Sequence, residues 1–378
     1  MVAQVAGSLV LLVVASLALR GLSRAIRVSP GFDAGRILTA EVTLDANRFP
    51  PSEERRYVEE AIHRVGALPG VESVSAAAVA VPATFLSIGT TIELEGPSPA
   101  HRPVNENPVA PGYFRTMGIR ILRGRDFLPS DRSGSAPVAI VNQAFARRFF
   151  PAAEALGRRV RTGERQTLEI VAVAGDSAYT MVGEAPQPVL YRPLAQDHGL
   201  GVVLHVRTEL APSTLTAAVR RELASLRNDI PIRVTTMTER IDQSLVTSRA
   251  IATLSAITGG LGMLLALIGL YGLISQSVTR RTAEIGVRIA LGATPQAVLR
   301  GVLREGLTLV GWGVVVGLLV ALVVVQPVAM ALFGGGRAAD PLGLIAPAVL
   351  LLLAGMAASY IPARRATRIE PATALRHE

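Results

Sequence analysis

Four long stretches of this chain contain no charged residue: residues 1–19, 250–279, 306–336 and 341–363. A helix of about 20 apolar residues is long enough to cross the hydrocarbon core of a bilayer. Each stretch can supply such a helix, so the pattern predicts four transmembrane helices. The block between the first two stretches, residues 20–249, has an ordinary charge content and is long enough for one or two folded domains.

The composition agrees with a membrane protein. Only 18% of the residues are charged, whereas soluble domains carry about 25%. The chain has no cysteine, which excludes disulfides and thiolate chemistry. It also has no lysine. Because a G-x-x-x-x-G-K-[ST] phosphate-binding loop needs its lysine, this chain cannot hydrolyse ATP by that route.

The distribution of arginine indicates which loops are cytoplasmic. Arginine-rich segments follow the second and the fourth apolar stretch, and two crossings separate them, so both lie on one side. The intervening loop, residues 327–342, has one arginine and one aspartate. Because loops rich in arginine stay in the cytoplasm, residues 20–249 are expected to be extracytoplasmic.

These boundaries divide the chain into three parts. We expect a first transmembrane helix at 1–20, an extracytoplasmic domain at 21–248 and a membrane domain at 249–378. The membrane domain contains transmembrane helices at about 250–275, 306–327 and 342–361, a cytoplasmic loop at 276–304 and a cytoplasmic tail at 362–378, anchored by Arg364 and Arg365.

The first apolar stretch opposes this topology by its own flanking charges. Arg20, Arg24 and Arg27 follow it on the outer side, whereas Met1–Gln4 has no charged side chain. One explanation is that the natural protein begins further upstream. The alternative is a cleaved signal peptide ending near Ala18, which the missing basic leader segment disfavours.

Residues 36–245 alternate between strand-like and helix-like patterns. Strands are predicted at 37–45, 70–81, 138–141, 168–174, 188–194 and 201–207, and helices at 51–68, 142–149 and 212–226. This interleaving predicts a mixed α/β domain. Breaks rich in Gly, Pro and Ser at 82–111 and 129–137 predict two lobes.

The outer domain carries no recognisable catalytic motif. The five histidines show no H-E-x-x-H pattern and no metal-like spacing, so we interpret them as ordinary surface or core residues. The segment "GDSAY", residues 175–179, is similar to a nucleophile elbow but lacks the second glycine. We interpret it as a turn after a strand and expect neither an enzyme nor a bound metal or cofactor.

The arginine-rich loop predicts a compact helix between two membrane crossings. Arg281 and Glu284 are three residues apart, and Glu284 and Arg288 four apart, so these side chains share one helix face and can pair. Ile285 and Ile289 form a neighbouring apolar stripe. From composition alone, a solvated loop resting on the headgroups is an equally good interpretation.

The end of this helix and the start of the next are marked by turn residues. Gly292 suits the left-handed conformation that follows a helix C-terminus. Thr294 can cap the next helix, with Pro295 at its first position. In the following apolar stretch, Gly313 and Gly317 stand at a spacing that allows close helix packing, although chance explains it equally well in a Gly-rich chain.

Several segments resemble one family. "RRTAEIGVRIALGATPQAVLRGVLREG" (280–306) and the ending "YIPARRATRIEPATALRHE" (360–378) resemble FtsX-like permeases, the membrane subunits of MacB-type ABC transporters. "VSPGFDAGRILTAEVTLD" (28–45), "ALPGVESVSAA" (67–77), "PGYFRTMGIRILRGRDF" (111–127) and "VAIVNQAFARRFFP" (138–151) resemble the MacB-type periplasmic core domain. Within this family, the chain resembles the second module of duplicated permeases that lack their own ATPase.

The resemblance implies a mechanism. A cytoplasmic ATP-binding cassette subunit would dock on Arg281–Ala293, with Glu284 and Arg288 as polar contacts. Nucleotide-driven movement would pass through the membrane helices to the outer domain and drive export. The implied location is the bacterial inner membrane. The implied partners are the separate ATPase, a second permease module or a second copy, an extracytoplasmic adaptor and membrane lipid, but no nucleic acid.

Two other classes of function compete with this interpretation. An FtsX-like regulatory scaffold would control an extracytoplasmic partner, such as a cell-wall hydrolase, and would move no small molecule; the large MacB-like outer domain argues against it. A membrane-anchored enzyme would need a clustered nucleophile, base or metal set in 20–249, and the sequence offers none.

Overall fold

The computed structural model describes residues 1–43, 50–83, 88–94, 102–163, 166–196, 201–281, 294–333 and 341–366. These residues belong to two compact units. The membrane unit contains residues 1–23 and 247–378, and the outer unit contains residues 24–246.

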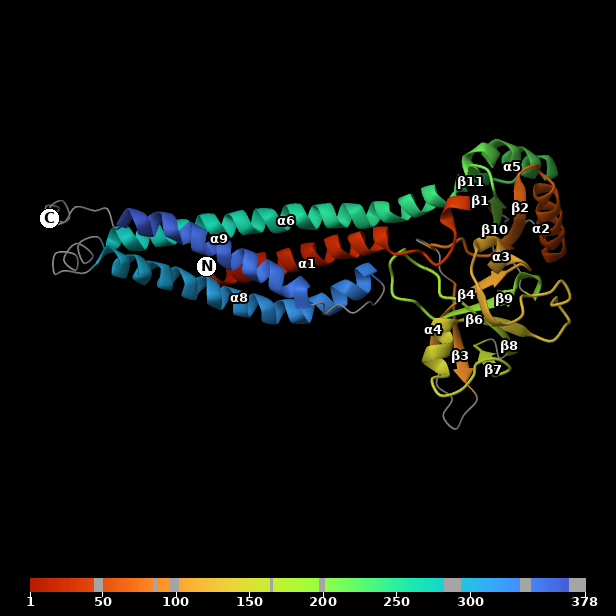
Figure 1. The fold of residues 1–378 in the computed structure, drawn as a ribbon, viewed down its shortest axis with the longest axis horizontal. Helices are drawn as coiled ribbons and strands as arrows, with labels where there is room; N and C mark the ends of the chain where they lie inside the picture. Colours follow the sequence, from red (N-terminus) through yellow and green to blue (C-terminus); the bar gives the residue numbers. More distant parts are fainter. Residues whose placement is uncertain are drawn as a thin grey trace. The chain divides into compact units, whose positions relative to one another are not determined.

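Four helices form the membrane unit and lie side by side (Figure 1). They are α1 (Val2–Arg27), α6 (Met237–Arg280), α8 (Pro295–Phe333) and α9 (Pro341–Ala366). The first residues of α6 belong to the outer unit. Each helix contains a segment long and apolar enough to cross a membrane: Val2–Ser23, Met237–Arg280, Gln296–Val324 and Leu342–Arg364. The prediction of one N-terminal and three C-terminal transmembrane helices is therefore confirmed.

The expected cytoplasmic loop at 276–304 is helical at both of its described ends. α6 continues to Arg280, and α8 begins at Pro295 and runs without a break into its membrane segment. The backbone amide of Ala297 donates to the carbonyl oxygen of Thr294 (2.9 Å), and this hydrogen bond begins the first turn of α8.

The first lobe of the outer unit is an antiparallel sheet covered by two helices (Figure 1). Its strand order is β11-β1-β10-β2, formed by Ile232–Thr236, Ile37–Val42, Val202–Thr208 and Val71–Ala77. α2 (Pro51–Gly66) and α5 (Pro212–Leu226) pack on one face. Leu38 and Leu204 project from the strands of that face, and Ala61 and Val219 from the helices, all fully buried. The period-two pattern of the strands thus meets the apolar stripes of the helices.

The second lobe is a closed barrel of six strands. The order is β4-β3-β7-β8-β6-β9, and β9 pairs with β4 to close the ring. The strands are β4 (Arg102–Val109), β3 (Ile88–Leu94), β7 (Arg159–Thr162), β8 (Thr167–Ala174), β6 (Val138–Asn142) and β9 (Val189–Pro193). β5 (Ile121–Gly124) adds to β8, α3 (Tyr113–Met117) contacts β2 and β10, and α4 (Gln143–Phe149) follows β6. The pair Ala77–Val109 joins β2 to β4, so both lobes share one continuous sheet.

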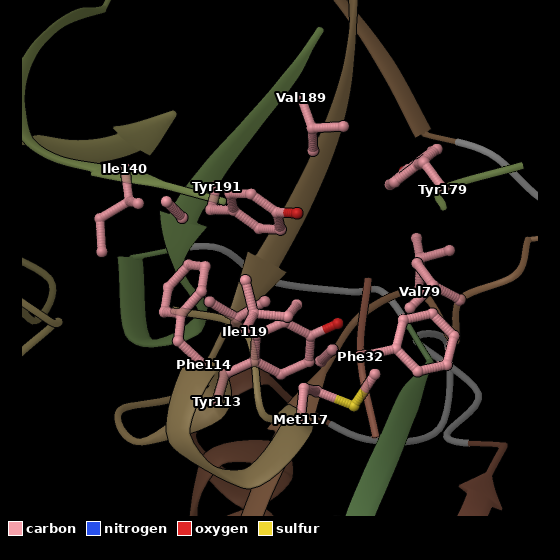
Figure 2. Close-up of a cluster of buried hydrophobic side chains, with 14 of the residues drawn as sticks. Phe32, Val79, Tyr113, Phe114, Met117, Ile119, Ile140, Tyr179, Val189 and Tyr191 are labelled. Carbon is pink, nitrogen blue, oxygen red and sulfur yellow. The ribbon is translucent and has the colours of Figure 1, made fainter. Parts of the chain in front are cut away.

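A core rich in aromatic residues lies in the outer unit. Figure 2 shows Tyr113, Phe114 and Tyr191 grouped with Met117 and Ile119. The rings of Phe114 and Tyr191 meet edge to face, with 5.0 Å between centroids. Such offset aromatic pairs add to the stabilisation that burial of their area provides.

The mixed α/β prediction is confirmed, but the interpretation of 82–111 as a break is wrong. The segment contains β3 and β4, two of the six barrel strands. Sequence reasoning missed them because β4 carries polar residues such as Glu106 and Asn107, which become buried only when partners from distant strands are in place. The short elements α3, β5, β7 and β11 were missed as well. The strand predicted at 70–81 ends at Ala77.

An ion pair is buried inside the barrel wall. Arg192 Nη1 on β9 donates to Glu106 Oε1 on β4 at 2.9 Å, and the two side chains are 6% and 7% exposed. Arg192 also donates to Gln166 Oε1 at 3.1 Å. Removing one partner of a buried pair leaves a charge that water cannot reach.

Arg192→Met is therefore expected to lower the free energy of unfolding of the barrel by about 3–5 kcal/mol. Hydrogen exchange of the barrel strands in the full-length chain measures the change. Arg161→Met is the matched control, because Arg161 pairs with Glu93 at 3.0 Å while about half exposed, and a pair of this kind contributes about 0–1 kcal/mol. Equal effects of the two substitutions on the free energy of unfolding would contradict the burial of the Arg192–Glu106 pair.

Candidate functional site

Of the docking element that the resemblance implies, Arg281–Ala293, the structure describes only the first residue, Arg281. Arg281 directly follows the end of α6, and its guanidinium lies 3.3 Å from the Glu305 carboxylate on α8, so the pair joins the chain segments on either side of the loop. Both side chains are well exposed, which limits such a pair to about 0–1 kcal/mol. The other predicted docking residues lie outside the described residues: Glu284, Ile285, Arg288, Ile289, Gly292 and Ala293.

Gly313 and Gly317 bring α8 into close contact with α1. A Cβ atom at Gly313 would lie 2.6 Å from Val5 Cβ, and one at Gly317 would lie 3.0 Å from the carbonyl oxygen of Ala6. Gly262 on α6 approaches the same helix from another side, where the Ser8 hydroxyl donates to its carbonyl oxygen (2.8 Å). Small residues thus allow the α1 backbone to nest against two neighbouring helices.

A second close junction joins α6, α8 and α9 near the ends of the loop. A Cβ atom at Gly306 would lie 2.6 Å from Ser359 Oγ and 2.8 Å from Ile274 Cδ1. Ser359 is buried and donates to the carbonyl oxygen of Gly355. Sequence reasoning did not single out Gly306. Its place directly after the charged Arg304 and Glu305, where the apolar stretch begins, was the available signal.

The predicted anchoring arginines end α9. Arg364 is exposed in its last turn, and Arg365 is the next residue of the helix. Near the opposite end of α9, Arg20 on α1 donates to the carbonyl oxygen of Leu342 at 2.9 Å. The arginines after the first apolar stretch therefore include one that ties two helices together, a contact that a count of flanking charges does not reveal.

The first turn of α6 is fastened to the sheet of the outer unit. Thr236 Oγ1 accepts from the backbone amide of Glu239 (3.1 Å), and the Glu239 carboxylate accepts from the amide of Thr236 (3.0 Å), a reciprocal capping box. Met237 is fully buried in the aromatic core. Arg240 pairs with Glu41 on β1 and donates to the carbonyl oxygen of Ala80 after β2. We call the contacts of residues 236–240 the α6 anchor.

His205 lies beside the α6 anchor with no exposed surface. On β10 it is directly opposite Thr39 of β1 and Ser75 of β2. The Tyr113 ring stands edge-on to it, at 5.4 Å between centroids. Burial, and secondly the positive charge of Arg240, lower the pKa of His205 to about 3. Its imidazole is therefore neutral at physiological pH and serves as a core residue, as the sequence indicated for the histidines as a group.

Two family models match the chain in order. The MacB-like periplasmic core domain matches residues 5–226, more than half of the chain, and the FtsX-like permease C-terminal model matches residues 256–371. The chain belongs to the MacB-type, FtsX-like permease family. With its four apolar helices, this permease is a multi-pass membrane protein with an extracytoplasmic domain.

Curated relatives are about one-quarter identical to this permease over the aligned residues. The macrolide export ATP-binding/permease protein MacB of Agrobacterium fabrum (strain C58) is 27% identical over 289 residues, 71% of this chain and 42% of the relative. MacB of Escherichia coli (strain K12) is 25% identical over 291 residues, 72% of this chain and 43% of the relative. The permease chain thus spans less than half the length of these relatives.

Solved structures of outer domains also match. The periplasmic region of MacB from Actinobacillus actinomycetemcomitans has 14% identity and a TM-score of 0.41, covering 58% of this chain and 97% of that one. The extracellular domain of the noncanonic ABC-type transporter YknZ from Gram-positive bacteria has 20% identity and a TM-score of 0.36, covering 52% of this chain and 99% of that one.

The glycine contacts predict how this permease responds to a single methyl group. Gly313→Ala is expected to destabilise the membrane unit by about 1–3 kcal/mol, because the new Cβ would collide with Val5. Gly311→Ala is the matched control on the same helix, since nothing lies within 4 Å of its Cβ position. The measurement is the thermal midpoint of the full-length chain in bilayer nanodiscs. A midpoint for Gly313→Ala equal to or above that for Gly311→Ala would refute the contact.

The buried histidine predicts a loss of stability in acid. In the unfolded chain, His205 binds a proton below about pH 6.5. In the folded chain, the His205 imidazole stays neutral down to about pH 3. The contribution of neutral His205 to the free energy of unfolding is therefore complete above pH 6.5. It is lost as the pH falls, by about 2 kcal/mol between pH 6.5 and 5.

Hydrogen exchange of β10 over this pH range, corrected for the intrinsic exchange rate, measures the change. His205→Leu should flatten the profile, because leucine does not titrate. The same acid slope in His205→Leu would show that other groups cause it.

Proposed function

We propose that this permease is the non-catalytic membrane subunit of an ABC transporter in the bacterial inner membrane. A separate cytoplasmic ATPase would supply the energy, and the outer domain would carry out an export stroke. The observation that carries this proposal is the order of parts: a spanning helix, a MacB-like core domain, and three FtsX-like spanning helices with an arginine-rich segment between the first two of these three.

The cytoplasmic end of the proposed pathway is the Arg281–Ala293 segment. An ATPase bound there would act on the end of α6 and the start of α8, which the exposed Arg281–Glu305 pair joins only weakly. The junction at Gly306 lies one residue further along α8 and is tightly packed against α6 and α9. We infer that this junction makes the three helices respond together to a movement of the docking segment.

The outer end of the proposed pathway is the α6 anchor. α6 is one helix from Met237 to Arg280, so its first turn belongs to the outer unit and its last turn adjoins the docking segment. Through Arg240, the first turn is tied to β1 and to the end of β2. A movement of α6 would therefore act on the sheet of the outer domain directly, without an intervening flexible loop after β11.

The apolar stretches support a mechanical stroke more than an ion-conducting path. Residues 250–279, 306–336 and 341–363 contain no charged side chain, whereas intramembrane ionisable residues usually mark proton and ion pathways. Two of the relatives are named as macrolide exporters. We accordingly propose that this permease takes part in export, together with a second module or a second copy and an extracytoplasmic adaptor.

The docking proposal is tested by purifying the tagged full-length chain from the membranes of its own organism. We expect an ATP-binding cassette subunit to co-purify with the native chain and to be lost, by at least tenfold, from Glu284→Arg. The reversed charge would repel a cation that the carboxylate contacts and would break the predicted pairing with Arg281 and Arg288.

Glu370→Arg is the control, because it makes the same change of charge in the cytoplasmic tail outside the docking segment. Retention of the ATPase by Glu284→Arg would refute docking at this segment. Absence of an ATPase from every preparation, with a cell-wall hydrolase bound to the outer domain instead, would favour the regulatory scaffold.

A further inference from the structure

A cleft of about 540 Å³ lies in the outer unit between α2, from Glu53 to Arg64, and the end of α5. Its apolar lining consists of Tyr57, Leu226 and Ile230, of which Tyr57 and Ile230 are more than nine-tenths buried. Charged side chains from both helix ends complete the lining. The volume is within the range of sites that bind small organic molecules, about 300–1,000 Å³.

The Tyr57 hydroxyl in this lining has no hydrogen-bond partner within the described part of the chain. Leaving a buried hydroxyl unsatisfied costs about 1–3 kcal/mol, so folds rarely retain one without a role. Burial raises the pKa of Tyr57 to about 12, although the positive charge of Arg227 opposes the shift. The hydroxyl is therefore protonated at neutral pH. Its oxygen has almost no exposed surface, so it can donate to a ligand beside Arg227 only after a charged side chain of the rim has moved aside.

The charged rim can rearrange at little cost. Arg227 Nη1 lies 3.5 Å from Glu53, while its Nε donates to Asp229 at 3.1 Å. Arg64 lies 2.6 Å from Glu60 and 3.8 Å from Glu222. Except for Asp229 and Glu222, these side chains are more than one-third exposed, and exposed pairs of this kind contribute about 0–1 kcal/mol each. A ligand that supplies its own charges can take the place of one partner.

The balance of charges on the cleft limits the chemistry of that ligand. Its lining contains three carboxylates and three guanidiniums: Glu53, Glu54, Glu60, Arg56, Arg64 and Arg227. A simple anion or a simple cation would meet repulsion from half of these groups. A ligand with one carboxylate and one ammonium, set apart along a small apolar body, can pair with both kinds and cover Leu226 and Ile230.

We propose that this cleft binds a short zwitterionic peptide. The peptide carboxylate displaces Glu53 from Arg227 and accepts the hydrogen bond that the Tyr57 hydroxyl donates. The ammonium group faces Glu60 and Glu54 on α2. The site is independent of the proposed docking of an ATPase, because it lies wholly in the outer unit and binds at equilibrium without nucleotide.

The experiment is isothermal titration of the full-length chain in nanodiscs with trialanine, a peptide that has both termini free. We expect saturable binding to the native chain. The N-acetylated and the C-amidated forms each lack one charge and should bind at least tenfold more weakly. Failure of trialanine to bind at millimolar concentration, or equal binding of all three forms, would overturn the proposal.

Two variants locate the site. Tyr57→Phe keeps the ring and removes only the hydroxyl, so it should weaken trialanine binding about tenfold while leaving the thermal midpoint of the ligand-free chain unchanged or raised. Arg227→Gln should also weaken binding. Arg123→Gln, which breaks the exposed pair of Arg123 with Glu154 elsewhere in the outer unit (2.7 Å), is the matched control and should bind normally. Native affinity in Tyr57→Phe and Arg227→Gln would place the peptide elsewhere and refute the site.

Discussion

Hydrocarbon offers no hydrogen-bond partner to a peptide group, and the membrane unit of this permease follows from that constraint. Within the described residues, each apolar stretch forms a helix that satisfies its own backbone. Buried hydroxyls also find backbone acceptors. The Ser8 hydroxyl is shared between the carbonyl oxygens of Gln4 on its own helix and of Gly262 on α6, and the Ser359 hydroxyl donates to the carbonyl oxygen of Gly355. Because lipid tails are as apolar as leucine, water does not drive these helices together. Close backbone approach at Gly306, Gly313 and Gly317 therefore supports their association.

Water is available to the outer unit, and several of its buried polar side chains are paired with groups from distant parts of the chain. Asn107 is fully buried, and its amide both accepts from and donates to the backbone of Val79. Asn142 caps α4 and also accepts from the amide of Val189. Glu106 and Arg192 neutralise each other inside the barrel wall. Apart from the local cap on α4, these contacts join segments that are distant in the chain.

The α6 anchor and the cleft lined by Tyr57 lie in different parts of the same outer unit. The anchor lies on the sheet face that carries His205, where Met237 is fully buried and Arg240 is half-buried against β1 and the end of β2. The cleft lies at the covering helices on the other face, where the ion pairs are exposed and replaceable. A firm attachment suits the transmission of movement, whereas a loosely paired rim suits the entry of a ligand. In our proposals, the mechanical role and the binding role therefore belong to opposite faces of the sheet.

Much of this organisation could be derived from the sequence because its causes are local. The number of crossings follows from uncharged runs, the extracytoplasmic side from the arginines, and α2 and β1 from apolar periodicity. The strand β4 could not be recognised, since Glu106 is acceptable there only after Arg192 of β9 is beside it. The same holds for Arg240 against Glu41 and for Gly306 against Ser359. Length and local pattern determine which segments become helices, but a contact between residues far apart in the chain exists only once tertiary packing has placed both partners.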